Sequence, residues 1–593
     1  MKDLLLRAAV LAVAAAGVVT VVVVARLVFS PVPPPPEREA GVLEFDEARA
    51  LERLVGGLAA TPASLQSDLE EAFPRVHGTL QLEALEDGLL LYYTWEGAEP
   101  EMAPILLASH GGLVPEGAGR SSAQEAAASS RRTAASAQQL SATAQGLLPP
   151  ARGPVAADGE TRRPGVGGVP LVMLAILEAV EGLLAQGMEP RRTVLLAFSA
   201  DGDDVGSQAG STVAADAGTV VRVLAERGIR PAWVLVGGAG SDTGLTTGLV
   251  PGLVDPVALV GVAERGFLEI ELTLASEAGA QQAGDAPGVD AAGDAGPTRR
   301  YGRVEVGPMG RRADAGGGSA WQGPPAALLA QAVARLEEPF DARIEGPGRE
   351  LLETTAPHMD PGTRMLIRNL WLFRGPMERA LARETGSMEL VRTTATPTFI
   401  RAGVDDGAHV SGGRPVEDAR ESGATRQSVE GRSEPRGRYD TPGATELTPD
   451  GAALARVRLH LAPWDSVEDV LETIRDRLRG LGVEVSIRAD AGFPVEPDPA
   501  RSADSYRGEG FQEVRAAVHH AFPDVIAVAP GVALTPTQGR RYHDVAGAVY
   551  RFSPFRLRVG GDHAVPDPVI TERHYLAMVR FYAELLRQAA PDV

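Results

Sequence analysis

Apolar residues in the first part of the chain follow the pattern of alternating strands and helices. Residues 104–108, 193–198 and 233–236 are short apolar runs, which are typical of buried strands. Residues 171–186 instead repeat apolar positions at the spacing of a helix. Strands separated by helices predict an α/β fold with a mainly parallel sheet covered by helices. The ligand site of such a sheet lies at the carboxyl ends of its strands, and His110 closely follows the first run.

A different pattern begins near residue 258. Residues 267–274 and 455–461 alternate apolar and polar positions, as half-exposed strands do. Ser466 and Asp469 precede and open a helical segment in the arrangement of a capping box. This part of the chain therefore predicts an α+β module whose sheet has one solvated face.

Three segments lack apolar periodicity and are rich in small, polar and charged residues. They span residues 116–163, 277–318 and 411–446. Segments of this composition cannot bury enough apolar surface to fold, so we expect flexible or disordered inserts.

The N-terminus carries an apolar run at residues 8–25, preceded by Lys2 and Arg7. A run of this length can span a bilayer as a helix, whereas a cleaved signal peptide usually has an apolar core of only ~7–15 residues. We expect an uncleaved transmembrane anchor over residues 4–30, with a cytoplasmic N-terminus and the body outside the cytoplasm. A proline-rich spacer over residues 31–42 would follow, and a cleaved signal peptide is the alternative.

Composition limits the partners and the metal ligands that the chain can have. The 593-residue chain has a formal net charge of -21 and few aromatic residues, which argues against nucleic acid as a partner. It contains no cysteine, so any zinc ion must be held by histidine and carboxylate ligands.

Five segments carry a resemblance to a known family: residues 105–115, 165–171, 191–206, 232–239 and 550–563. In this order they resemble the zinc aminoacylase and carboxypeptidase family, most closely its carboxypeptidase S and N-fatty-acyl-amino-acid hydrolase branch. The family reads His-x-Asp, Leu-Asp-Asp-Lys, His-Asp-Glu-Glu, Asp-Glu-Gly-Gly and a late histidine. The resemblance implies a zinc-exopeptidase-like catalytic domain interrupted by a lid or dimerisation domain.

The resemblance also implies a division of the chain. Residues 43–257 and 496–593 would form the two halves of the catalytic-type domain. Residues 258–495 would form the inserted lid or dimerisation domain, through which a homodimer is expected.

The ligands of the first zinc ion are largely replaced. His110 matches the first histidine of the family. Gly167 and Gly168 stand where the family has its aspartate pair, and Val236 and Gly237 stand in place of Asp-Glu. One neutral imidazole without these carboxylates will not hold the ion.

The second zinc site keeps two matching residues. Asp203 matches the second glutamate of His-Asp-Glu-Glu with a shorter side chain, and His563 matches the late histidine. The family's general base falls at Gly202, and loss of a base costs about 10²–10⁴ in rate. A one-residue slip would instead make Asp203 the base and Asp204 the ligand.

Arg540 matches the arginine that, by resemblance, would hold the free α-carboxylate of a substrate. A guanidinium fork suits a carboxylate, although Arg540 could equally be a surface charge beside Arg541.

Two functions follow. The chain is expected to be a non-catalytic pseudoenzyme or binding module, because the bridging aspartate, an acidic ligand and the base are absent together. The alternative is an active metallohydrolase with a rearranged or single-metal site, which cleaves small peptides or N-acyl amino acids next to a free α-carboxylate. A decaying copy without a selected role is a third interpretation.

Overall fold

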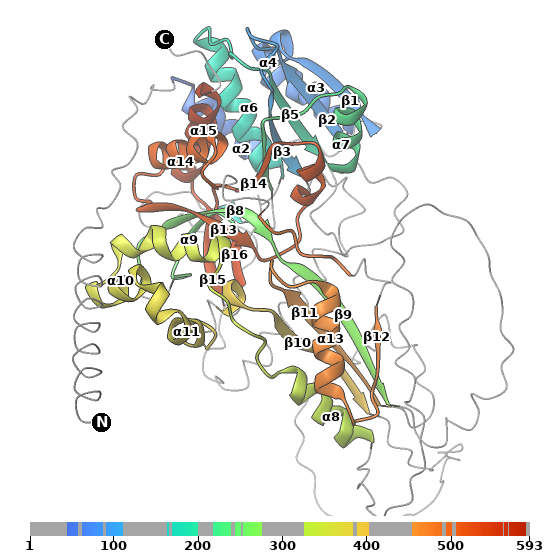
Figure 1. Ribbon diagram of the computed structural model, residues 1–593. Helices are drawn as coiled ribbons and strands as arrows, with labels where there is room; N and C mark the ends of the chain where they lie inside the picture. Colours follow the sequence, from blue (N-terminus) through green and yellow to red (C-terminus); the bar gives the residue numbers. More distant parts are fainter. Residues whose placement is uncertain are drawn as a thin grey trace, which may run out of the picture.

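The structure is a computed structural model of the whole chain (Figure 1). It describes residues 44–56, 62–86, 90–110, 163–164, 169–199, 217–238, 243–250, 253–274, 325–383, 388–402, 453–488, 494–500, 506–560, 563–566 and 569–588. The predicted spacer and nearly all of the three predicted inserts lie outside these residues.

The expected membrane location is corrected by the structure. Within the described ranges, no helix has both the length and the apolar character needed to cross a membrane. This finding overturns the expected single-pass anchor, whose residues 4–30 themselves lie outside the described part of the chain.

A large sheet forms the centre of the molecule. Its strands run in the order β1 (Gln81–Leu85), β2 (Leu90–Trp95), β5 (Val194–Ser199), β3 (Ile105–His110), β6 (Trp233–Gly237), β14 (Ala548–Arg551), β8 (Val257–Glu264), β7 (Leu245–Thr247), β15 (Arg556–Gly560) and β16 (His563–Pro566), with β13 (Ala527–Ala533) also paired to β8. The apolar runs at residues 104–108, 193–198 and 233–236 form the neighbouring strands β3, β5 and β6 of this sheet. The predicted α/β fold is therefore confirmed.

The sheet is mixed, and the prediction of a mainly parallel sheet is wrong in this respect. Parallel pairs join β3 to β5 and β6, β14 to β6, β13 to β8, and β15 to β7. The pairs β1–β2, β2–β5, β8–β14, β7–β8 and β15–β16 are antiparallel. Strands that follow one another after a few residues, as β1 and β2 or β15 and β16 do, can pair only in the antiparallel direction.

Both faces of the sheet are covered. One face packs against α2 (Glu47–Gly56), α3 (Pro62–Ala72), α4 (Pro74–Thr79), α6 (Val169–Ala185), α14 (Glu509–Ala521) and α15 (Glu572–Arg587). The other face packs against α7 (Ala217–Glu226) and the 3₁₀ helix η6 (Gln538–Asp544). Successive residues of a strand enter opposite cores, since Leu107 packs on the first face and Leu106 on the second.

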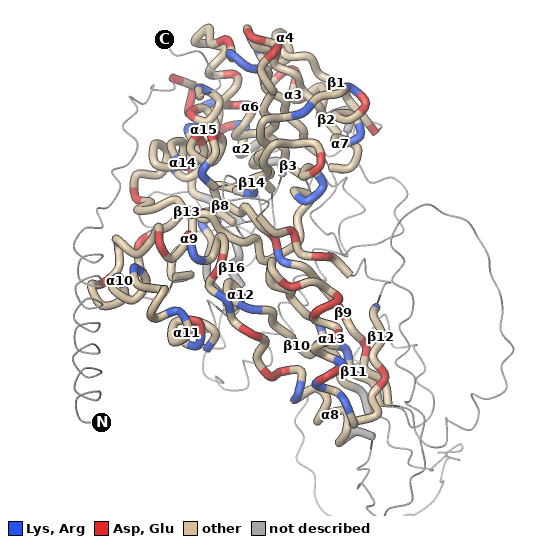
Figure 2. The backbone as a smooth tube through the Cα atoms, viewed as in Figure 1, with Lys and Arg blue, Asp and Glu red and all other residues tan. Residues whose placement is uncertain are grey.

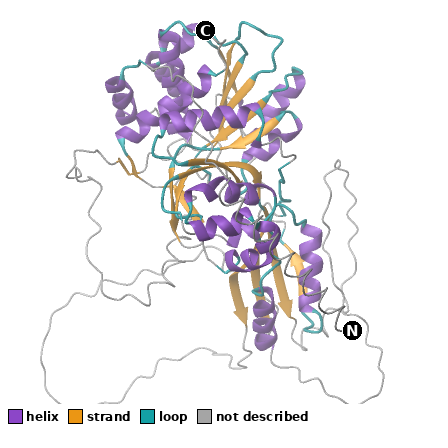
Figure 3. Cartoon of the chain, turned by 60° about the vertical axis from the view of Figure 1, so that its left-hand side comes forward, coloured by secondary structure: helices purple, strands orange, loops and turns teal. Residues whose placement is uncertain are grey.

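A second, antiparallel sheet lies at the opposite end of the molecule from α15 (Figures 1 and 3). Its order is β10 (Thr394–Ala402), β11 (Ala453–Leu461), β9 (Gly266–Leu274) and β12 (Glu484–Ile487), with α8 (Pro325–Leu336) and α13 (Val467–Leu478) packed on one face. The predicted N-cap of α13 is confirmed, because the Asp469 amide donates to Ser466 Oγ at 3.1 Å, and the Asp469 carboxylate accepts from the Ser466 hydroxyl at 2.7 Å instead of from its backbone amide as in a full capping box. The predicted α+β pattern is therefore present.

Neighbouring strands of this sheet carry arginine and glutamate residues (Figure 2). Arg456 lies opposite Glu271 in the strand register and pairs with it at 3.1 Å. Arg458 lies opposite Glu269 and pairs with it at the same distance. Such cross-strand pairs help to fix the register of β9 and β11.

A helical layer covers the strands near β13. It consists of α9 (Gly346–Thr355), η4 (Ala356–His358), α10 (Pro361–Arg368), α11 (Leu370–Leu381) and α12 (Met388–Val391), and it shares an apolar core with β8, β13 and the residues Leu249, Val250 and Leu253 after β7. A short pair of strands, β4 (Arg163–Pro164) and β17 (Val569–Ile570), stands apart from both sheets.

One residue separates the two sheets. β8 ends at Glu264 and β9 begins at Gly266, so only Arg265 lies between them. The Arg265 side chain is fully buried and donates to the carbonyl oxygens of Arg392, at 3.0 Å, and of His460. It thus fixes the beginning of β10 and the end of β11 to the corner between the sheets.

Helix α14 approaches the large sheet closely at Gly510. A Cβ atom there would lie 2.5 Å from ring atoms of buried Trp233 and 2.7 Å from the Tyr550 ring. We expect Gly510→Ala to lower the free energy of unfolding by about 1–3 kcal/mol, as overpacking does. Urea unfolding would measure this change. The matched control is Gly348→Ala in the first turn of α9, where the nearest atom is 3.5 Å away; a similar loss there would contradict the packing argument.

Candidate functional site

The candidate site begins at the carboxyl ends of two adjacent parallel strands. His110 is the last residue of β3 and Ser199 the last of β5, and the two are register partners. His110 Nδ1 lies 2.8 Å from Ser199 Oγ, and His110 Nε2 lies 2.7 Å from the hydroxyl of Tyr542 in η6. All three side chains are fully buried. Both imidazole nitrogens therefore already have partners.

The surroundings of His110 oppose a positive charge. Burial, and to a lesser extent the positive charge of Arg541, lower the pKa of His110 to about 3. The ring is thus neutral near pH 7, with one N–H and one lone pair. Since both are engaged, a zinc ion could bind His110 only by displacing a buried hydroxyl.

The other two predicted ligands are Asp203 and His563. Asp203 lies outside the described residues, and His563 begins β16, where it is the register partner of Gly560. Among the residues that the structure describes, no three histidine or carboxylate side chains are grouped closely enough to hold a metal ion. The zinc site made of His110, Asp203 and His563 stays a prediction.

The positions where the family has its Asp-Glu pair are closed by neighbouring strands. Val236 is buried in the core between the sheet and η6. A Cβ atom at Gly237 would lie 3.2 Å from the Phe552 carbonyl oxygen, and Ser553 Oγ hydrogen-bonds the next backbone amide, that of Gly238, at 2.9 Å. Little space is left there for a longer acidic side chain.

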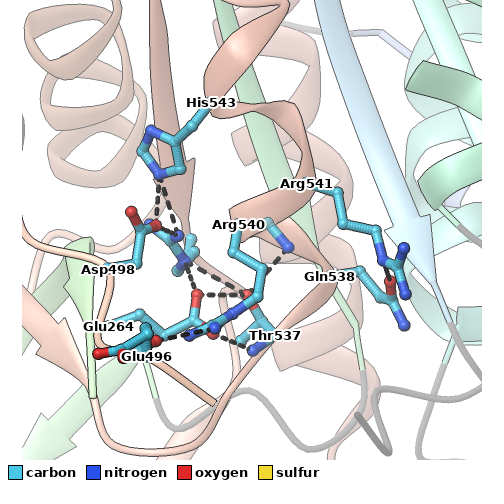
Figure 4. A network of polar contacts seen from close by, with 10 residues as sticks. Glu264, Glu496, Asp498, Thr537, Gln538, Arg540, Arg541 and His543 are labelled. Carbon is cyan, nitrogen blue, oxygen red and sulfur yellow. Dashed lines mark hydrogen bonds and ion pairs between the residues drawn. The ribbon is translucent and has the colours of Figure 1, made fainter. Parts of the chain in front are cut away.

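Arg540 belongs to a buried polar network around Glu264 (Figure 4). Glu264 ends β8 and its carboxylate is fully buried. It accepts from Arg551 Nε at 2.7 Å, from Arg540 Nε at 3.1 Å, and from the amide and hydroxyl of Thr537. A buried carboxylate is stable only with such compensation, so Glu264 holds η6 and β14 together.

A second carboxylate completes the network. Asp498 Oδ2 lies 2.5 Å from Arg551 Nη2 and 2.5 Å from His543 Nε2. Burial by itself raises the pKa of Asp498, but the hydrogen bond from His543 and the positive charge of Arg551 outweigh it, so the pKa is lowered. Asp498 is therefore ionised at neutral pH, and the two carboxylates balance the two guanidinium groups.

Arg540 is held at two of its three nitrogens. Nε binds Glu264, and Nη1 donates to the Glu496 carbonyl at 2.9 Å. Nη2 is buried and has no hydrogen-bond partner among the described residues. Arg541 points away from Glu264 and donates to Gln538 at 2.8 Å (Figure 4). Of the two neighbouring arginines, Arg540 is the one with a buried donor to spare.

The structure brings His110 and Arg540 together through η6, since Tyr542 lies two residues after Arg540. Sequence analysis assigned no role to Glu264, Asp498 or Arg551. Glu264 and Asp498 lie outside the five segments that carry the resemblance, whereas Arg551 lies in the last of them. The sequence feature that could have drawn attention to Glu264 is a charged residue at the end of the apolar strand β8.

Comparison with known proteins gives three results. No family model matches the chain. The N-fatty-acyl-amino acid synthase/hydrolase PM20D1 of Bos taurus is 24% identical over 505 residues, covering 84% of this chain and 77% of that protein. The probable carboxypeptidase S-like 2 of Dictyostelium discoideum is 25% identical over 529 residues, covering 88% and 78%.

Among solved structures, an M20 family metallo-carboxypeptidase of Sulfolobus solfataricus aligns with a TM-score of 0.43 and 13% identity, covering 92% of this chain and 99% of the other. The names of the sequence relatives match the family branch that the five segments of the sequence resemble. The resemblance is thereby confirmed, and the chain is a relative of the N-fatty-acyl-amino-acid synthase/hydrolases and of the carboxypeptidase S proteins.

Proposed function

We propose that this protein binds small molecules with a free α-carboxylate, such as N-acyl amino acids or small peptides, through Arg540. The observation that carries this proposal is the fixed guanidinium of Arg540, whose Nη2 is buried and has no hydrogen-bond partner among the residues that the structure describes. A buried donor left unpaired costs about 1–3 kcal/mol, which a ligand oxygen would recover. Hydrogen bonds between charged groups are about twice as strong as neutral ones, so an anionic ligand is favoured.

The geometry around Arg540 supports recognition of a planar anion. Glu264 and the Glu496 carbonyl fix the guanidinium from two directions, so little side-chain entropy is lost when a ligand binds. Arg551 lies in the same network, and its Nη1 is also buried without a hydrogen-bond partner in the described part of the chain. Arg540 and Arg551 thus each keep one buried N–H group, unpaired within the described residues, that could donate to the carboxylate of a ligand.

We further propose that the protein acts without metal-dependent hydrolysis. The hydrogen bonds of His110 to Ser199 and Tyr542 support this interpretation, as do the glycines at the positions of the family's aspartate pair. The alternative is an amide hydrolase with a single metal at Asp203 and His563. It is favoured by the relatives, whose names describe a hydrolase and a carboxypeptidase.

The expected homodimer is retained as a proposal. β10 is an edge strand of the second sheet, and it exposes Phe399 by 42% and Ile400 by 57%. An apolar edge strand is a surface on which a second copy could add its own strand. We expect Ile400→Lys to shift the protein from dimer to monomer in sedimentation velocity; a wild-type chain that sediments as a monomer would refute the proposal.

Carboxylate recognition makes a direct prediction for binding. We expect N-acetylleucine to bind, and N-acetylleucinamide, which lacks the carboxylate, to bind about 10–100-fold more weakly, because a charged hydrogen bond contributes about 1.5–3 kcal/mol. Arg540→Ala should cause a similar loss, and Arg540→Lys a smaller one. Isothermal titration calorimetry would measure all four affinities.

The control for charge is Arg556→Ala, which removes an arginine from an exposed pair with Asp524. It should leave the affinity unchanged. Equal binding of the acid and the amide to the wild-type chain would sink the carboxylate proposal without reference to any variant.

Metal content separates the binding module from the hydrolase. We expect the purified full chain to hold well under one zinc ion per molecule by elemental mass spectrometry, and to show no chelator-sensitive hydrolysis of N-acyl amino acids. Stoichiometric zinc that is lost in His563→Ala, together with chelator-sensitive turnover, would establish the alternative instead.

A further inference from the structure

Three hydroxyl and imidazole groups form a continuous buried chain across the carboxyl edge of the large sheet. Ser199 Oγ, the His110 ring and the Tyr542 hydroxyl follow one another at 2.8 and 2.7 Å. They come from β5, β3 and η6, three segments far apart in the sequence. The rings of His110 and Tyr542 are also stacked, with centroids 5.8 Å apart and an interplanar angle of 23°.

The arrangement leaves no nitrogen of His110 available. A neutral imidazole has one N–H and one lone pair, and a hydroxyl can either donate or accept. Whichever tautomer is present, one hydroxyl accepts from the N–H and the other donates to the lone pair. The lone pair is the electron pair with which a histidine binds a metal ion.

The same contact fixes the segment that carries Arg540. In a 3₁₀ helix, residues three apart lie on the same side, so Arg540 and His543 face the same way. They bind Glu264 and Asp498, while Tyr542 lies on another side of η6 and packs in the core against the sheet. η6 is therefore held on one side by the two carboxylates and on another by His110.

We propose that the Tyr542 hydroxyl takes the place of a metal ion on His110, and that Tyr542 is a positioning residue that fixes η6 and hence Arg540 for carboxylate binding. The second half of this inference rests on the proposed function; the first half does not. It reverses the role that sequence analysis gave to His110, from metal ligand to anchor.

The first arm of the test measures the metal. The full chain is dialysed against zinc chloride and then against metal-free buffer, and bound zinc is measured for wild type and His110→Ala. We expect the two proteins to bind the same amount of zinc, because His110 is not a zinc ligand in this proposal. A lower zinc content in folded His110→Ala would overturn the replacement of the metal by Tyr542.

The second arm measures the position of η6 in Tyr542→Phe by hydrogen exchange. We expect amides of residues 538–544 to exchange about tenfold faster, the equivalent of losing one buried hydrogen bond, while other buried helices are unchanged. The matched control is Tyr582→Phe, since the Tyr582 hydroxyl is also buried but has no hydrogen-bond partner within the described residues. Unchanged exchange of η6, or faster exchange throughout the chain, would refute a positioning role.

The third readout is ligand selectivity. Tyr542→Phe should reduce the preference for N-acetylleucine over N-acetylleucinamide about tenfold, a change that general loss of stability would not produce. If the wild-type chain shows no such preference, the proposed function fails, while zinc content and hydrogen exchange still decide whether Tyr542 replaces a metal and anchors η6.

Discussion

Burial of the Glu264 carboxylate is the constraint on which the arrangement of the site depends. An ionised carboxylate with no solvent exposure must be compensated by donors from the protein, and breaking such a buried pair by removing one partner typically costs about 3–5 kcal/mol. The donors come from Thr537, Arg540 and Arg551. This one group therefore determines where η6 lies relative to β8 and β14, and η6 in turn brings Arg540 and Tyr542 to the edge of the sheet.

Local patterns in the sequence were enough to predict the central strands and the place of His110 at the end of one of them. The apolar runs are β3, β5 and β6, His110 lies at the carboxyl end of β3, and Ser466 caps α13 as expected. The mixed character of the sheet could not be read in the same way, because strand direction is decided by pairing between distant segments. The helices over residues 346–391 were not predicted either, and they are short elements that share a core with β13.

The environment of His110 was beyond prediction for a related reason. Its partner Tyr542 is 432 positions away, and nothing near His110 in the sequence indicates a hydroxyl over its ring. Similarity at 24–25% identity identifies the scaffold and the place of the histidine, but a neighbouring side chain decides what the imidazole does.

The corner at Arg265 has a mechanical consequence. The two sheets meet at Arg265, and the segment after β12 pairs with both of them, Val495 with Phe267 and Asp498 with Glu264. Here the guanidinium is buried and bound to carbonyl oxygens of Arg392 and His460, which belong to the second sheet and the segment leading into it. Rotation would strip these hydrogen bonds from a buried charge, at a cost of several kcal/mol. The corner therefore resists rotation of the smaller sheet relative to the larger one.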